Sequence, residues 1–543
     1  MQSSILTIVC LPVWVRAAFI CLTTAVLLSP VSLLAIETNN FTWARPLTSF
    51  KKEDSFRASV MDAGGNVFAA YRHIDQPDPL PTRSNLVLKV SPSGEVLWHH
   101  RLLPGVRALV VTSSNILVAG SIADASIPTS LAVPSSYFSS KGISTEGTGG
   151  AYIARLSPES GVVESVKLLG TSLYVLPFGM VATPEGGLVI WGYYSRGSAQ
   201  FGGISLPATS PSSARNLFLV KLDANGETVW AQTFVNADPS FGNPRGLAVD
   251  PAGNVICSAV SGTYSYAGGQ IDGNHSQFAV KFDPDGKCLW SRPGVPGTGV
   301  IITDAEGNIY FPEGFEKLSP DGQSLWKAPP ARKAVIDSKG NIFATGTFTT
   351  QFDSAGNADR ELGSLKLGSF SLNTIAETEI YIVKYAPSGL VKWAAQTRGL
   401  EAAFRPRDFR YYPVSISAPD QIYLHPDGGI FLGGTVRGRV LLGDTELTGA
   451  HNQDFSPPPT FFVARLSDHS TNRAFLRIET VSDDAVRLLW LIRASDHVLE
   501  SSEGLLSTNW VPVDQVPAVS GDQYSVRVHT GGRRKYFRLR EQF

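Results

Sequence analysis

The segment Asn216–Trp230 reads NLFLVKLDANGETVW and contains the pattern that decides the fold. A short run of apolar and β-branched residues leads to Lys221, a turn ends at Gly226, and Trp230 follows nine residues after the lysine. Short β-rich runs bounded by turn residues predict strands. A glycine in the left-handed conformation closes a bulged hairpin. The segment therefore predicts two antiparallel strands joined by a tight turn.

The same spacing recurs along the chain, at Lys89 and Trp98, Lys281 and Trp290, Lys317 and Trp326, and Lys384 and Trp393, with a degenerate copy from Arg155 to Glu164. A second pattern, Asp-x-x-Gly-Asn, alternates with the first and is clearest at Asp250–Asn254, Asp304–Asn308 and Asp337–Asn341. Each copy then has four strands, of which the third ends in the basic residue and the fourth holds the tryptophan. A four-strand unit that recurs along the chain indicates an array of small sheets. No segment shows a 3.6-residue apolar period of helix length, so the predicted class is all-β.

The number of strands predicts how the array ends. Basic third strands end at seven places: Lys89, Arg155, Lys221, Lys281, Lys317, Lys384 and Arg465. Trp43 has no such strand before it, and Arg465 has no tryptophan strand after it. Pairing residues 41–47 with residues 461–466 supplies the missing strand and removes the two edges that an open array would expose. We therefore predict a seven-bladed β-propeller over residues 36–469, closed by its N-terminal strand.

The repeated tryptophans are predicted to pack between neighbouring blades rather than to bind a ligand; they are Trp43, Trp98, Trp230, Trp290, Trp326 and Trp393. The basic residues are predicted to be solvated strand ends. The Asp-x-x-Gly-Asn segments are predicted to be turns, because no copy has the dense carboxylates and late glutamate of a calcium loop.

Cys257 and Cys288 fall on the second and fourth strands of one sheet, roughly 10 Å apart. This exceeds the roughly 7 Å limit for a disulfide, so two free, buried thiols are predicted.

The two ends of the chain differ from the repeat. Residues 1–35 are almost wholly apolar and carry a single charged side chain, Arg16, which indicates a signal peptide cleaved near Ala35, with an uncleaved membrane anchor as the alternative. Residues 470–543 are predicted to form a small β-sandwich. Its expected strands are Ala474–Ser482, Ala485–Ile492, Val498–Ser501, Trp510–Val513, Tyr524–His529 and Lys535–Arg540.

Composition excludes one class of partner. Lys and Arg total 46 against 47 for Asp and Glu, without a basic block, so nothing favours binding to nucleic acid. No Gly-x-Ser-x-Gly elbow, phosphate loop or zinc spacing occurs, and the adjacent His99 and His100 would point to opposite faces of a strand. The sequence thus predicts no catalytic, cofactor-binding or metal-binding residue.

Three stretches carry a resemblance to a known family: Asp337–Gly346, Leu365–Gly368 and Glu379–Trp393. They resemble the SBBP-type repeat, found in seven-bladed β-propellers of secreted bacterial proteins. The resemblance implies a secreted or surface protein and is nearly silent on activity. We expect a secreted, periplasmic or cell-surface protein that is monomeric after signal cleavage and whose partner is an unknown protein or carbohydrate. The segments 499–502, 508–510 and 536–540 look like a terminal module of secreted proteins of Gram-negative bacteria.

A second resemblance supports an alternative. The segments Leu222–Trp230 and Phe282–Trp290 look like the tryptophan-docking motif of quinoprotein propellers, which implies pyrroloquinoline quinone and calcium at the ring centre. Those proteins typically have eight blades, against seven counted here. The leading hypothesis is a binding propeller whose contacts come from the loops after Ser121, Ser195 and Phe348. The alternatives are an exported enzyme, either a quinoprotein oxidoreductase or a polysaccharide-active enzyme, and a structural envelope protein.

Overall fold

The computed structural model describes residues 41–541 with gaps, of which the longer ones are 47–54, 76–81, 122–149, 401–415, 449–459 and 469–476. The predicted signal peptide lies outside the described residues. The described part is all-β, as predicted, and its helical content is the single 3₁₀ turn η3 (Pro312–Gly314). Within these residues no helix is both long and apolar enough to cross a membrane.

The strands form antiparallel units of four that follow one another along the chain. Unit 1 has the order β2 (Ser55–Met61), β3 (Val67–Asp75), β4 (Thr82–Val90) and β5 (Val96–Leu102). Its first turn starts at Asp62, its third strand ends next to Lys89, and its fourth strand holds Trp98. The strand assignment made from the two sequence patterns is therefore confirmed in this unit.

The next five units repeat this order. Unit 2 is β6 (Val106–Val111), β7 (Ile116–Ser121), β8 (Gly150–Leu156) and β9 (Val163–Thr171); unit 3 is β10 (Tyr174–Ala182), β11 (Leu188–Ser195), β14 (Asn216–Leu222) and β15 (Thr228–Asn236); unit 4 is β16 (Pro244–Val249), β17 (Val255–Val260), β20 (Gln277–Phe282) and β21 (Cys288–Pro293); unit 5 is β22 (Ile302–Thr303), β23 (Ile309–Phe311), β24 (Glu316–Leu318) and β25 (Ser324–Lys327); unit 6 is β26 (Lys333–Ile336), β27 (Ile342–Thr349), β32 (Thr378–Tyr385) and β33 (Val391–Gln396).

Unit 7 combines the two ends of the array. It consists of β35 (Ile416–Leu424), β36 (Ile430–Arg437), β39 (Thr460–Leu466) and β1 (Phe41–Pro46), so its outer strand comes from the N-terminal side of the chain. The register of β1 on β39 places Trp43 opposite Arg465 and Ala44 opposite Ala464. A single parallel pair, Thr378 with Ile416, joins unit 7 to unit 6.

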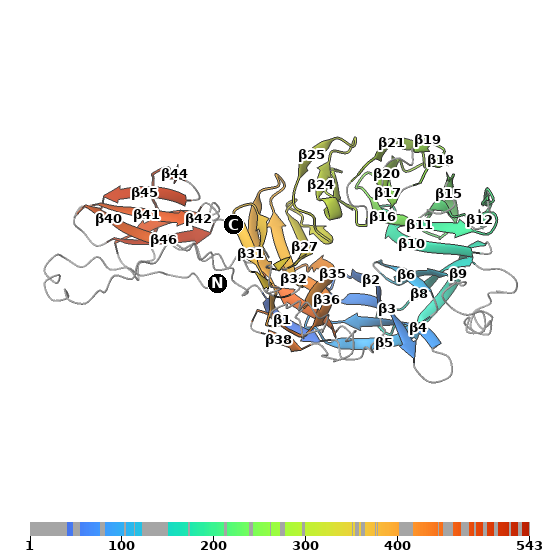
Figure 1. Ribbon diagram of the computed structural model, residues 1–543, viewed down its shortest axis with the longest axis horizontal. Helices are drawn as coiled ribbons and strands as arrows, with labels where there is room; N and C mark the ends of the chain where they lie inside the picture. Colours follow the sequence, from blue (N-terminus) through green and yellow to red (C-terminus); the bar gives the residue numbers. More distant parts are fainter. Residues whose placement is uncertain are drawn as a thin grey trace.

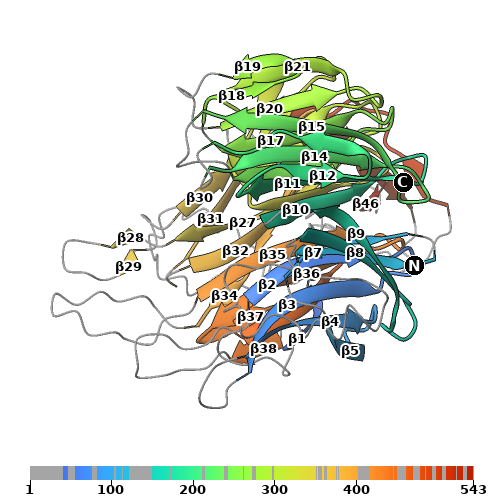
Figure 2. The same ribbon diagram turned by 90° about the vertical axis from the view of Figure 1, so that its right-hand side faces the viewer.

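The first strands of successive units lie side by side. β2 contacts β6, β6 contacts β10, β10 contacts β16, β16 contacts β22, β22 contacts β26, β26 contacts β35, and β35 contacts β2. Figure 1 shows the units arranged around the region where these strands meet, with β2, β6, β10 and β16 on their inner side. Figure 2, from the side, shows the strands of units 3 and 4 running next to each other.

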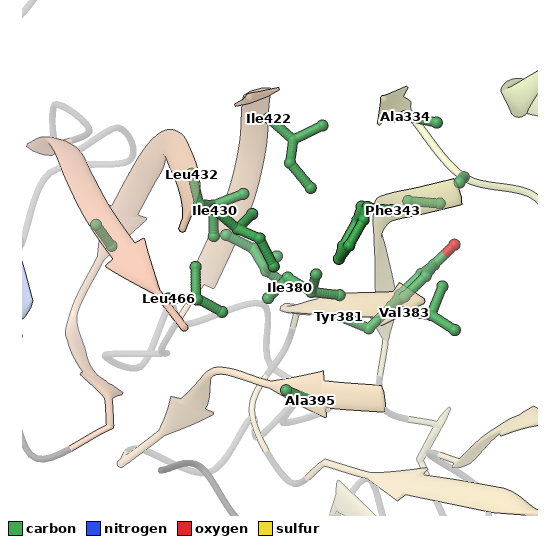
Figure 3. Close-up of a cluster of buried hydrophobic side chains, with 14 of the residues drawn as sticks. Ala334, Phe343, Ile380, Tyr381, Val383, Ala395, Ile422, Ile430, Leu432 and Leu466 are labelled. Carbon is green, nitrogen blue, oxygen red and sulfur yellow. The ribbon is translucent and has the colours of Figure 1, made fainter. Parts of the chain in front are cut away.

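The apolar core lies between the sheets of neighbouring units. Figure 3 shows Phe343 and Ile380 of unit 6 in one cluster with Ile430, Leu432 and Leu466 of unit 7. A separate cluster joins unit 7 to unit 1, where Phe431, Phe461 and Val463 pack against a group from unit 1 that is Val67, Ala69, Tyr71, Leu88 and Val90. Side chains on both faces of these strands are buried, which explains their nearly continuous apolar runs.

Short hairpins lie between the second and third strands of several units and reach the preceding sheet. The hairpin of β12 (Ala199–Phe201) and β13 (Ile204–Leu206) pairs with β9, and that of β18 (Tyr264–Tyr266) and β19 (Gly269–Ile271) pairs with β15. The remaining short strands are β28 (Gln351–Phe352), β29 (Ala358–Asp359), β30 (Ser364–Leu367), β31 (Phe370–Asn373), β34 (Arg398–Gly399), β37 (Arg439–Leu442) and β38 (Thr445–Thr448). The two sequence patterns predict loops, not hairpins, at these places.

The C-terminal residues form two further sheets, drawn beside the larger group in Figure 1. One has the order β40 (Arg477–Ser482), β41 (Ala485–Leu491), β45 (Gln523–His529) and β44 (Ala518–Ser520). The other has the order β43 (Val511–Pro512), β42 (His497–Ser502) and β46 (Tyr536–Glu541). Val486 and Val526 of the first sheet share an apolar cluster with Leu499 and Phe537 of the second.

Candidate functional site

The tryptophans of the repeat contact the turn of the next unit. The indole Nε1 of Trp230 donates a hydrogen bond to the Pro284 carbonyl oxygen at 3.0 Å. Equivalent bonds run from Trp98 to Pro158, from Trp290 to Pro320 and from Trp326 to Pro387. Trp393 donates instead to the Asp468 carboxylate at 3.3 Å. The side chain of Trp43 lies outside the described residues.

Four of the five repeated lysines are buried and Lys384 is half-buried, so the prediction of solvated strand ends is wrong for them. Lys281 is 2 % exposed; its Nζ donates to the Pro320 carbonyl at 3.0 Å and lies 2.9 Å from the Asp250 carboxylate. Lys221 in the same way meets the Pro284 carbonyl and Glu185. The ammonium group can leave water because a carboxylate of its own unit and a carbonyl of the next unit replace the lost hydration.

The Asp-x-x-Gly-Asn segments are tight turns, as predicted. In the first of them Asp250 Oδ1 accepts the Asn254 backbone N–H at 2.9 Å, and Oδ2 accepts the Asn254 side-chain amide at 2.8 Å. Burial opposes ionisation, but these hydrogen bonds and the Lys281 ion pair hold the pKa of Asp250 below its usual range. The carboxylate is thus occupied by the turn itself and by the lysine.

Both thiols of the described chain are free. Cys257 lies on β17 and Cys288 on β21, with β20 between them, which is the predicted placement. Cys257 is buried, and burial raises the pKa of its thiol well above the usual value. Cys288 is only half-buried, so the prediction of a buried thiol is wrong for this residue, which sits on the outermost strand of unit 4.

A different set of residues meets on the first strands of the units. The pairing of β2 with β3 skips one residue: Phe56 lies opposite Tyr71 and Ala58 opposite Ala70, which leaves Arg57 as the extra residue of a β-bulge. A bulge leaves one residue out of the hydrogen-bonded ladder and re-aims its side chain. The same irregularity places Arg107, Phe178, Arg245 and Asp420 at the bulges of β6, β10, β16 and β35.

These bulges occupy one position in the repeat, five residues before the first residue of the turn that follows. In units 5 and 6 that position is held by Gly299 and Arg332, just before β22 and β26. We call these seven residues the inner ring: Arg57, Arg107, Phe178, Arg245, Gly299, Arg332 and Asp420. Four of the seven are arginines, and they come from units 1, 2, 4 and 6.

The inner ring is accessible although its strands are the innermost of each sheet. Phe178 is 41 % exposed, Arg245 and Arg332 are exposed, and Arg57, Arg107 and Asp420 are half-buried. The exposed ring of Phe178, at the bulge of β10, offers an apolar face to a ligand.

The single carboxylate of the inner ring sits beside two cations. Burial raises the pKa of Asp420 to about 6, and the charges of Arg332 and Lys333 oppose that rise. Burial also lowers the pKa of Lys333, against the effect of Asp420 and Glu313. The charges between units 5, 6 and 7 are therefore mixed in sign.

The side formed by units 2, 3 and 4 is cationic. The guanidinium of Arg215 lies 4.7 Å from the centre of the Tyr193 ring, and its Nη1 donates to Asn243 at 3.1 Å. Arg107 and Arg215 both act electrostatically on the Tyr193 hydroxyl, whose pKa burial raises above its usual range. Two arginines, Arg107 and Arg215, thus lie near the Tyr193 ring in this part of the array.

A cavity of about 30 Å³ lies between units 1 and 7, lined among others by Ser59, Tyr71, Asp420 and Tyr423. This volume holds one or two water molecules. Ser59 and Tyr423 share a hydrogen bond of 2.5 Å across it. The cavity is too small to accept a ligand of its own.

The structure describes the three loops predicted as contact surfaces only in part. The loop after Ser121 lies outside the described residues, the loop after Ser195 forms the β12–β13 hairpin, and the one after Phe348 contributes β28–β31. Among the described residues, no three His, Cys, Asp or Glu side chains come together as ligands for a metal ion. The inner ring itself was missed, although aligning the repeats on their turns would have revealed it.

Comparisons with known proteins give only distant likenesses. No family model matches the chain and no curated protein matches it, so the SBBP resemblance stays a prediction. Three solved structures that it resembles are of β-propeller proteins. They are BamB from Moraxella catarrhalis (10 % identity, 78 % of this chain and 99 % of that one, TM-score 0.31), an α-L-arabinofuranosidase from Fusarium graminearum (9 %, 79 % and 97 %, 0.33) and a catalytically inactive virginiamycin B lyase from Staphylococcus aureus (9 %, 82 % and 95 %, 0.26).

Likenesses this weak carry no argument about the activity, ligand or location of this chain. The chain itself is all-β, with small antiparallel sheets of the β-propeller type.

Proposed function

We propose that this chain is an exported seven-bladed β-propeller, closed by its N-terminal strand, that binds a ligand at the inner ring without transforming it. In this proposal residues 470–543 form a C-terminal β-sandwich. Closure is supported by the pairing of β1 with β39 and by the apolar cluster that units 7 and 1 share. Where these units meet, a Cβ on Gly65 would lie 1.8 Å from His425 Nε2, so only glycine fits there.

One observation carries the binding proposal: arginines occupy four equivalent positions of the repeat around the inner strands, three of them at bulges and the fourth, Arg332, just before β26. The pairing of buried strands does not require arginine at these positions. A bulged residue lies outside the regular pairing of the two strands. Polar residues that converge from several repeats at the centre of a radial array are typical of a binding site.

Binding is favoured over glycoside hydrolysis by the charge pattern. Hydrolysis of a glycosidic bond needs two carboxyl groups across the scissile bond. Asp420 is the only carboxylate among the seven inner-ring residues. Export, and with it a periplasmic or cell-surface location, rests on the apolar leader seen in the sequence.

A glycan array followed by recovery of the bound ligand tests this proposal. We expect a bound saccharide to be released with unchanged mass after hours of incubation. Phe178→Ala should weaken binding at least tenfold, because it removes the apolar face of the inner ring. Leu289→Ala is the matched control, since Leu289 is 50 % exposed on the outermost strand of unit 4. A cleaved or oxidised ligand, or equal binding by both variants, would refute the proposal.

A further inference from the structure

We propose that the inner ring is a site for a small multivalent oxyanion, whose carboxylate, sulfate or phosphate groups are bound by Arg57, Arg107, Arg245 and Arg332. This inference rests on the proposed binding function and names the chemistry of its ligand. It concerns the cluster of charged residues on the first strands rather than the loops between strands.

The repeat geometry is the first support. The extra residue of a bulge lies outside the regular register of the ladder, and its side chain is re-aimed relative to its neighbours. Arg57, Arg107 and Arg245 all sit at such bulges, in units 1, 2 and 4. The first strands of consecutive units contact one another, and these arginines occupy the same position of the repeat, five residues before the turn that follows. One ligand with several anionic groups can then engage more than one unit.

The chemistry of the guanidinium group is the second support. Its planar fork donates two parallel hydrogen bonds to a carboxylate, sulfate or phosphate, and such charge-assisted bonds are stronger than neutral ones. The whole chain is nearly neutral, with a formal net charge of -1, so four arginines at one repeat position are a local concentration of positive charge.

The charged residues around the inner ring predict where the anionic groups of the ligand bind. Asp420 accompanies Arg332 and Lys333 at units 6 and 7, whereas Arg107 lies near Arg215 on the opposite side, among units 2, 3 and 4. The anionic groups of the ligand should therefore lie closest to Arg57, Arg107 and Arg245. Arg332 is balanced in part by Asp420 and contributes less.

Phe178 adds an apolar contact. It occupies the unit 3 position, between Arg107 of unit 2 and Arg245 of unit 4, and its ring is partly exposed. A sugar or other carbon ring that carries oxyanion groups can lie on this face while the flanking arginines bind its charges.

Calorimetry on the full chain tests the proposal with three probes: citrate for carboxylates, inositol hexakisphosphate for phosphates and sucrose octasulfate for sulfates. Uncharged sucrose is the neutral control. At least one anion should bind, and its affinity should fall as salt is raised. Arg245→Ala should lower that affinity at least tenfold. Arg245→Lys keeps the charge but loses the planar guanidinium that donates two parallel hydrogen bonds. Its affinity for the anion should lie between those of the alanine variant and the wild type.

Arg487→Ala is the matched control, because Arg487 is an exposed arginine on β41, in the C-terminal sheets. Equal melting temperatures establish that each variant folds. The proposal is overturned if none of the three anions binds, or if Arg245→Ala and Arg487→Ala bind them equally. If a saccharide from the glycan array is lost in Phe178→Ala but retained in Arg245→Ala, the binding function stands and the oxyanion assignment fails.

Discussion

Lys281 and Trp290 lie directly opposite each other on neighbouring strands and donate to the same acceptor, the Pro320 carbonyl of the next unit, at 3.0 and 3.1 Å. The lysine also meets Asp250 of its own unit, so one ammonium group links two turns and two sheets. The equivalent pair Lys221 and Trp230 converges on Pro284. Contacts between units are therefore made by polar groups at the turns as well as by the apolar faces.

Removing the lysine should destabilise the array strongly. Lys281→Met leaves the Asp250 carboxylate, which is 3 % exposed, without its counter-charge. Breaking one partner of a buried ion pair typically costs about 3–5 kcal/mol. We expect a clear drop in the urea midpoint of unfolding. Lys287→Met changes an exposed lysine of the same unit and should cost less than about 0.5 kcal/mol. Equal midpoints for the two variants would contradict this role of Lys281.

A cross-link can test whether the N-terminal strand closes the array. Ala44 and Ala464 are register partners on β1 and β39, and directly opposed residues of antiparallel strands are about 4.5–5.5 Å apart between Cα atoms. That separation suits a disulfide. The double variant Ala44→Cys/Ala464→Cys should form one on mild oxidation, detected as a cross-linked peptide. Ala44→Cys with Ala334→Cys, which places the second thiol on β26, should not. Failure of the first pair to cross-link would argue against the paired strand.

Asp420 should oppose anion binding at neutral pH. Arg332, Lys333 and Tyr71 face it, and its pKa is raised to about 6 by burial. Lowering the pH from 7.5 to 5 neutralises the carboxylate, so the affinity for sucrose octasulfate, whose sulfates stay ionised, should rise. Asp420→Asn should bind about threefold or more tightly at pH 7.5, the effect of one nearby charge in a watery environment. This variant should show little pH dependence between 5 and 7.5, and a slope equal to that of the wild type would exclude Asp420 as its source.

Glu379 should make the folded state less stable as the pH rises. It is 2 % exposed and accepts hydrogen bonds from Thr374, Gln396 and the Gly399 backbone, yet burial raises its pKa from 4.5 to about 7. The folded state thus keeps a proton that the unfolded chain loses. The contribution of protonated Glu379 to the free energy of unfolding is complete below pH 4.5. It is lost as the pH rises towards about 7, by up to about 1.4 kcal/mol per pH unit.

The measurement is the difference in melting temperature between the wild type and Glu379→Gln at each pH from 4.5 to 8. Subtracting the variant removes other groups, such as Asp420, that titrate in the same direction. The difference in melting temperature should change between pH 4.5 and about 7 and level off as the pH approaches 8. A constant difference throughout would show that Glu379 does not titrate there.

The two cysteines should react at different rates. Cys288 is half-buried and lies 3.5 Å from the Tyr266 hydroxyl, whereas Cys257 is buried and its thiol pKa is raised. Iodoacetamide reacts with the thiolate, so Cys288 should be alkylated in the folded protein while Cys257 is protected until unfolding. Mass spectrometry of the two peptides reads each site separately. Equal labelling, or a mass change of two hydrogens on reduction, would contradict two free thiols in these environments.

The sequence predicted the strands because each is encoded locally. The nine-residue spacing of Lys89 and Trp98 is the length of one bulged hairpin, and in the structure the two residues are register partners. The same reasoning could not tell that the lysines are buried. The carbonyl that Lys281 reaches is 39 residues further along the chain, so a solvated strand end and a bridging lysine look alike in sequence.

The inner ring was missed for a physical reason as well. Alternation of side chains identifies the faces of a strand, and a bulge shifts that alternation by one residue. Arg57 therefore reads as a break in the pattern rather than as part of a site. Only the distance to the following turn is constant, and it becomes visible once the repeats are superposed on their turns.

Each bulged residue stands outside the hydrogen-bonded ladder, and this separates recognition from architecture. Exchanging the side chain at a bulge should leave the register of the paired strands in place. The five bulge positions could thus be altered one at a time during evolution, and descendants of the same scaffold could acquire new ligand preferences without first becoming more stable.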